Sequence, residues 1–138
     1  MAVILSTSSS SAPPRSSVNA LDVEFPTLVC AASAGVHGAL VVPHAHESPA
    51  LGVAFAVAAL ALAAAAVSQA VFISQAARVA VPALLLMVAG AYLLSRTTGI
   101  PALTVHPEPF DALGAAISSL EVAAAVVMLR PPTRRSPT

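Results

Sequence analysis

The sequence has no lysine and no tryptophan, and only 9% of its 138 residues are charged. A soluble globular domain carries about 25% charged residues. Six basic and six acidic side chains are therefore too few to cover a soluble surface of this size. Hydrophobic residues make up 57% of the chain, which excludes extensive disorder. Lipid is the solvent that fits this composition.

Other features are missing as well. The single cysteine, Cys30, excludes an internal disulfide and a cysteine-based metal cluster, and is expected to be a small packing residue. The net charge of zero gives no reason to expect a nucleic-acid partner. The chain has no phosphate-binding loop and no serine or cysteine nucleophile beside a base. We therefore expect a protein that is not an enzyme.

What the sequence does contain is four long apolar segments. They predict membrane spans at about 25–42, 49–73, 78–96 and 110–129. A span needs about 20 residues, so the first segment is marginal in length. Residues 1–22 lack the basic start and apolar stretch of a secretory signal, and we expect them to be a disordered tail. A second disordered, cytoplasmic tail is expected at 131–138. The prediction for residues 23–130 is an all-α fold, a transmembrane four-helix bundle.

Proline, glycine and serine predict where these helices begin and end. Pro43 is expected to end the first helix, because proline disfavours helical backbone in the residue before it. A capping serine followed by proline, Ser48-Pro49, predicts the start of the second helix. Residues 74–77 are expected to form a tight turn, and Gly99 with Pro101 to stop the third helix. The fourth helix is expected to begin at Pro109–Asp111.

The arginines indicate an orientation. All six basic residues are arginine, and this bias in an alanine-rich chain suggests a GC-rich bacterial genome. With four spans, one side of the membrane carries Arg15, Arg78, Arg130, Arg134 and Arg135, and the other side carries only Arg96. Basic residues in short flanking segments stay cytoplasmic. We therefore expect a bacterial inner-membrane protein with both termini in the cytoplasm and its histidines at the outer face.

Glu121 is the strongest single candidate for a functional residue, because it lies near the middle of the last apolar segment. A carboxylate there is costly in lipid and should face the bundle and find a partner. One hypothesis is a proton relay or ion site formed with His37. The alternative is a neutral acid that fixes helix packing through Ser118, Ser33 or His37.

Histidines precede and follow Pro43 and suggest a metal site. Imidazole and carboxylate ligands from His37, His44, His46 and Glu47 suit zinc, copper, nickel or iron. The spacing matches no closed zinc or haem motif, so solvated loop histidines and a hydrogen-bonded His37 are the competing interpretation. Haem held between His37 and a second histidine is a further alternative. The sequence itself requires no cofactor.

Arg96 lies at the outer end of the third segment, close in sequence to two acids. With Thr97 and Thr98 it could bind an anion, or it could pair with Glu108 or Asp111 across the outer connection. The simpler interpretation is that Arg96 neutralises a helix C-terminus and Asp111 a helix N-terminus. We expect these three charged residues to form polar contacts at the outer face.

Small residues recur every four positions in the first segment. Ala31, Gly35 and Ala39 form one row, and Ala34 with Gly38 forms a second row. Rows of this kind let helices approach closely in lipid. The expected partners are therefore the lipid bilayer and, through these rows, another membrane protein or a second copy of the chain.

Several of these residues together resemble a group of small bacterial four-span integral membrane proteins of unknown function, found in GC-rich bacteria. The likeness covers about residues 26–129 and is carried by Ala34–His37, Pro43-His44, Glu47, Pro49, Arg96–Pro101, Pro107–Pro109, Asp111 and Glu121. The resemblance implies a membrane location and no particular activity.

Taken together, these patterns favour a non-enzymatic accessory or assembly component of a membrane. The alternative is a binding or transport module that handles a metal ion or protons with its outward-facing histidines and acids.

Overall fold

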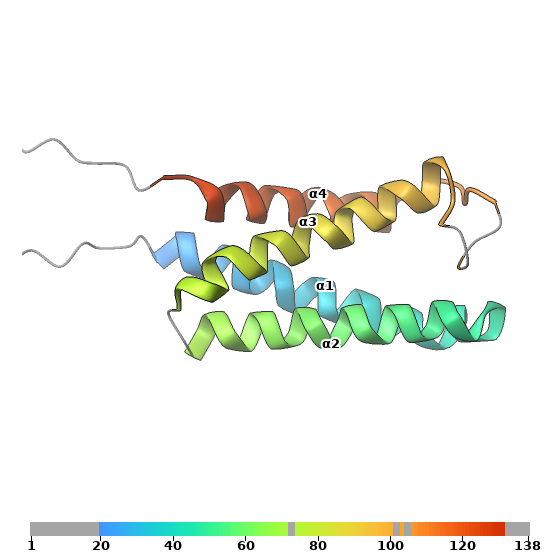
Figure 1. The fold of residues 1–138 in the computed structure, drawn as a ribbon, viewed down its shortest axis with the longest axis horizontal. Coiled ribbons are helices and arrows are strands. Elements are labelled where there is room, and N and C mark those ends of the chain that lie inside the picture. The colour runs from blue at the N-terminus through green and yellow to red at the C-terminus, as the bar shows by residue number, and fades with distance from the viewer. Residues whose placement is uncertain (1–19, 72–73, 101–102, 104–105, 132–138) are drawn as a thin grey trace, which may run out of the picture.

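In the part of the chain that it describes, the computed structural model contains four α-helices (Figure 1). It describes residues 20–71, 74–100, 103 and 106–131. The helices are α1 (Ala20–Glu47), α2 (Pro49–Val71), α3 (Gln75–Thr97) and α4 (Ala112–Leu129). No strand occurs in these ranges. The predicted all-α, four-helix fold is confirmed.

Successive helices run antiparallel and form two hairpins, α1–α2 and α3–α4 (Figure 1). Helix α1 packs most extensively against α2, and α3 against α4; the hairpins meet mainly through α1 and α4, with a smaller contact between α2 and α3. The start of α1, the end of α2, the start of α3 and the end of α4 share one end of the bundle, called here the terminal end. The α1–α2 turn and the α3–α4 connection lie at the opposite end, the loop end.

All four helices are long and apolar enough to cross a membrane. The first span, marginal by sequence, extends over Glu24–Glu47, which is 24 residues. At 1.5 Å per residue this length exceeds a hydrocarbon core of about 30 Å. Large apolar side chains such as Leu28, Leu60, Val79 and Met87 are exposed, as helices surrounded by lipid require. The four helices are therefore compatible with a multi-pass membrane protein.

The prediction that Pro43 ends the first helix is wrong. Helix α1 includes Pro43 and continues to Glu47, so the polar connection shrinks to Ser48. Packing against α2 explains the continuation: Gly52 leaves no room for a Cβ beside Ala45, and the ring of Phe55 lies 4.3 Å from that of His44. Proline within a membrane helix is tolerated where neighbouring groups hold the surrounding turn.

Other boundaries shift by a few residues. Helix α1 begins at Ala20, within the expected N-terminal tail of residues 1–22, whereas residues 1–19 and 132–138 lie outside the described part of the chain. Ser74 caps α3 through a hydrogen bond from the Ala77 amide, so 75–77 are helical and do not form the expected turn. Asp111 caps α4, which leaves Pro109 outside that helix. The expected end of the second span, residues 72–73, is not described.

The core lies in the terminal half of the bundle. It contains residues early in α1 and α3 and late in α2 and α4, namely Val29, Cys30, Leu62, Ala65, Ala66, Val81, Leu85, Val88, Ala124 and Ala125. Small side chains dominate it and allow close helix approach. In the loop half the hairpins diverge (Figure 1), and this divergence makes room for the candidate site.

Candidate functional site

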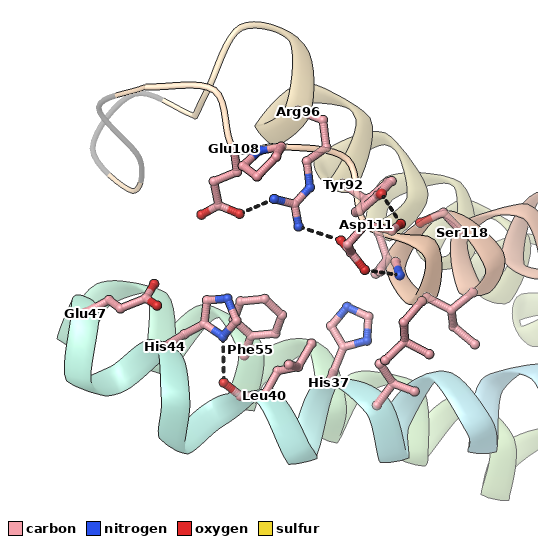
Figure 2. A pocket seen from close by; sticks show the side chains of 16 residues that line it. His37, Leu40, His44, Glu47, Phe55, Tyr92, Arg96, Glu108, Asp111 and Ser118 are labelled. Carbon is pink, nitrogen blue, oxygen red and sulfur yellow. Dashed lines mark hydrogen bonds and ion pairs between the residues drawn. The ribbon is translucent and has the colours of Figure 1, made fainter.

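A cleft of ≈ 470 Å³ opens between α1 and the α3–α4 hairpin in the loop half of the bundle. We call it the loop-end cleft. Figure 2 shows side chains of α1 on one side facing charged side chains of the hairpin on the other. Its polar lining comprises His37, His44, Glu47, Tyr92, Arg96, Glu108, Asp111 and Ser118, and its apolar lining includes Leu40, Phe55, Val88 and Ile117.

Arg96 organises the hairpin side of the cleft. Its Nη1 donates to the Glu108 carboxylate, and its Nη2 donates to Asp111 Oδ2 at 2.9 Å. The guanidinium also lies 5.0 Å from the centre of the Tyr92 ring, and its side chain is only 14% exposed. The predicted polar contacts of Arg96 are therefore present with both acids. A guanidinium held by two carboxylates has little capacity left to bind a further anion.

Backbone contacts hold these two acids in place. The Glu108 amide donates to the Ser95 carbonyl at 3.0 Å, so the connection folds back against the end of α3. Asp111 Oδ1 accepts from the Gly114 amide at 2.6 Å, and the Tyr92 hydroxyl donates to the Asp111 carbonyl at 3.1 Å. Gly114 has no space for a Cβ beside the Tyr92 ring. Glycine at this position is therefore what lets the aromatic ring pack against the first turn of α4.

The α1 side of the cleft carries two histidines on either side of one aromatic ring. His37 and His44 stand two helical turns apart, and their rings lie 5.6 Å and 4.3 Å from that of Phe55. His44 Nδ1 contacts the Leu40 carbonyl at 2.9 Å, and His37 Nδ1 contacts the Ser33 carbonyl at 2.9 Å. Because each Nδ1 atom contacts a carbonyl of its own helix, the Nε2 atom of each ring is the one available to exchange protons with the cleft.

Below the cleft, Glu121 is completely buried in the middle of α4, at 0% exposure. One carboxylate oxygen, Oε1, accepts a hydrogen bond from the hydroxyl of Ser33, which is also 0% exposed. The Ser33 hydroxyl in turn lies 3.3 Å from His37 Nδ1. The other oxygen, Oε2, has no hydrogen-bond partner among the described residues. Ser33 thus links the buried acid to a histidine in the cleft wall, and Ser118, which lines the cleft, lies one turn above Glu121.

The four predicted metal ligands do not form a ligand set. In the described ranges no three His, Cys, Asp or Glu side chains lie close enough together to hold a metal ion. His37, His44 and Glu47 line the cleft, whereas His46 does not. Axial haem ligation requires histidines on opposite sides of a pocket, and His37 and His44 come from the same helix and contact the same ring. The arrangement gives the haem alternative no support.

The sequence analysis did not predict a polar contact between α1 and α2. The Gln69 side-chain amide, near the end of α2, donates to Cys30 Sγ at 3.6 Å. Gln69 also lines a shallow groove at the terminal end, together with Glu24 and Thr27. The sequence feature that could have predicted this contact is the amide side chain of Gln69 in an otherwise apolar span, because such a polar group needs a hydrogen-bond partner in lipid.

The site therefore combines a buried carboxyl group, a hydroxyl that contacts it, and a histidine that reaches an open cleft. Such groups can transfer a proton by breaking and forming only N–H and O–H bonds. Comparison with protein-family models, with curated proteins and with solved structures finds no match to this chain.

Proposed function

We propose that this chain is a non-enzymatic membrane protein that takes up and releases protons at Glu121 through the loop-end cleft. The observation that carries the proposal is the buried Glu121 carboxyl, which has one oxygen on Ser33 and one oxygen without a described partner. A charged group at the centre of a membrane helix costs about 2.5–3.5 kcal/mol on insertion scales. A carboxylate at this depth is therefore best accommodated when a proton or a cation accompanies it.

The relay works in three balanced transfers. A proton from the cleft binds His37 Nε2, and the proton on Nδ1 passes to the Ser33 hydroxyl. That hydroxyl passes its own proton to Glu121, so each group that receives a proton also releases one until the carboxyl holds it. The contacts of Ser33 with His37 and with Glu121 support this order. His37 ends as its other neutral tautomer, and the reverse transfers, which return the proton from Glu121 to the cleft, restore the starting state.

The proposal includes an orientation. The terminal end carries Arg78 and Arg130, whereas the single arginine at the loop end, Arg96, is neutralised by two acids. Under the positive-inside rule, the terminal end lies in the cytoplasm and the cleft opens to the outside of a bacterial inner membrane. Protons would then reach Glu121 from the outer face.

Infrared spectroscopy of the full-length chain in lipid tests the relay. A protonated carboxylic acid has a carbonyl band that shifts in D₂O, and we expect Glu121→Gln to remove one such band. His37→Leu should slow exchange of the band by about a hundredfold, the typical contribution of one positioned proton-transfer group.

The matched control is His46→Leu, because His46 belongs to the same helix but does not line the cleft. Exchange in this variant should match that of the unmodified chain. Equal exchange rates in the His37 and His46 variants would contradict the relay, as would a carbonyl band that survives in Glu121→Gln.

An accessory role remains the second candidate, and one observation favours it. Ala31, Gly35 and Ala39 are exposed, and a Cβ on Gly35 would meet nothing within 4 Å. This row is free to receive a helix from another protein. Isolation of the tagged chain from native membranes tests this role: a partner should be retained by the unmodified chain and lost from Gly35→Leu.

A further inference from the structure

The loop-end cleft carries an excess of negative charge. Three carboxylates line it, from Glu47, Glu108 and Asp111, against the single guanidinium of Arg96. Two of these carboxylates already share that guanidinium. Glu47 pairs with no described residue. With neutral histidines the cleft therefore has two net negative charges, and walls of low dielectric concentrate their field.

The walls below the charged mouth are apolar and aromatic. The Phe55 ring lies close to both histidine rings, and Leu40, Val88 and Ile117 belong to the same lining. The volume of ≈ 470 Å³ falls within the range of small-molecule pockets, about 300–1,000 Å³. A mainly apolar pocket with a few convergent polar groups is the usual form of such a site.

These two properties select one class of ligand. The negative charge disfavours anions, and no described cluster supplies three ligands for a metal ion. An organic cation satisfies both halves of the cleft, because its charge meets the carboxylates and its carbon body meets the apolar wall. An ammonium group can also lie against the face of an aromatic ring such as Phe55.

We propose that the loop-end cleft binds a small monovalent organic cation, an ammonium group attached to an apolar or aromatic body. The ammonium group lies toward Glu47 at the mouth, and the body lies against Phe55 and Leu40. The site is distinct from the buried carboxyl, since Glu121 is not part of the cleft lining. Binding therefore does not depend on the proton relay, although His37 belongs to both.

The chain contains its own reporter for this site. It has one tyrosine and no tryptophan, and that tyrosine, Tyr92, lines the cleft. Tyrosine emission of the purified full-length chain thus reports on the cleft. We expect a saturable change in emission with benzyltrimethylammonium, and none with benzenesulfonate, which has a similar body and the opposite charge.

Two glutamates provide a matched pair of variants. Glu47→Gln removes an unpaired carboxylate from the mouth and should weaken binding of the quaternary ammonium about tenfold, because one Coulombic attraction near the protein surface is lost. Glu24→Gln removes an exposed carboxylate at the terminal end and should leave binding unchanged. Phe55→Leu should weaken binding several-fold, because the aromatic body loses its contact with the Phe55 ring while the wall stays apolar.

Three results would overturn the proposal: no saturable change, equal binding of benzenesulfonate, or equal affinity in the Glu47 and Glu24 variants. The Glu121→Gln variant separates this proposal from the proton relay, because it should still bind benzyltrimethylammonium. Cation binding without proton exchange at Glu121 would remove the relay alone, and proton exchange without cation binding would remove the cleft ligand alone.

Discussion

At the scale of single residues, Ser33 and Glu121 are the two buried polar side chains of the described chain, and each lies at the middle of its helix. The sequence placed Glu121 near the membrane centre, because its depth depends only on its position in an apolar segment. It left Ser33, Ser118 and His37 as alternative partners. The rotation of α1 against α4 selects Ser33, which no local pattern encodes.

This pair predicts a particular pattern of stabilities. Ser33→Ala leaves both oxygens of a buried carboxyl without a donor, and we expect a loss of about 1–3 kcal/mol in the free energy of unfolding. Replacing both partners, in Ser33→Ala with Glu121→Leu, should recover most of this loss, since no polar group is then left unsatisfied. Unfolding of the chain in detergent, followed by circular dichroism, measures both values.

Ser119→Ala provides the control. The Ser119 hydroxyl is exposed and bonds only to the carbonyl of Ala115 on its own helix, at 2.7 Å. Its loss should change stability by less than about 0.5 kcal/mol. A Ser33 variant as stable as the Ser119 variant would be inconsistent with the buried hydrogen bond.

At the scale of helices, some helix boundaries follow from local sequence patterns and others depend on packing between helices. The caps at Ser74 and Asp111 are local, and the predicted start of α4 at Pro109–Asp111 includes the residue that caps it. The prediction that Pro43 ends the first helix was wrong because it used only a local preference, that of the residue before a proline for extended backbone. The contacts of Ala45 and His44 with α2 outweigh that preference and keep the last turn of α1 helical.

Glycine substitutions test this account of helix packing. Gly52→Ala adds a Cβ only 2.9 Å from the Ala45 backbone, and we expect it to reduce the free energy of unfolding by about 1–3 kcal/mol. Gly90→Ala adds a Cβ that meets nothing within 4 Å in the middle of α3. It should stabilise by about 0.5–1 kcal/mol, because alanine loses less entropy than glycine in a helix.

Hydrogen exchange of the amides around Ala45 supplies the second measurement. It should accelerate in Gly52→Ala and stay unchanged in Gly90→Ala. Equal effects of the two substitutions would mean that the close contact between α1 and α2 does not hold the last turn of α1.

At the scale of the whole molecule, the two ends of the bundle differ in character. The terminal half contains the small-residue core, and the loop half contains the cleft. The two small-residue rows of α1 also differ: Gly38 faces Ala59 of α2, whereas Gly35 faces outward. One row therefore assembles this bundle, and the other stays available on its outer surface.

The proposed orientation is testable with two exposed positions at opposite ends, His46 and Gln75. In a Cys30→Ala background, we expect His46→Cys to react with a membrane-impermeant maleimide in intact cells. Gln75→Cys should react only after lysis, because the terminal end is proposed to face the cytoplasm. The reverse labelling pattern would invert the orientation and move the cleft to the cytoplasmic side.

By itself, the sequence determined that the chain forms four helices long and apolar enough to span a membrane, and that Glu121 lies near the middle of the last one. Each of these follows from the transfer of one segment's own residues into lipid, which does not depend on how the segments pack. Only the tertiary structure decided that α1 continues past Pro43, that Ser33 meets Glu121 and that Arg96 holds both acids. It also divided the predicted metal ligands, placing His37, His44 and Glu47 in the cleft lining and His46 outside it. These outcomes depend on helix rotation and on the divergence of two hairpins, which are set by contacts between residues far apart in the chain.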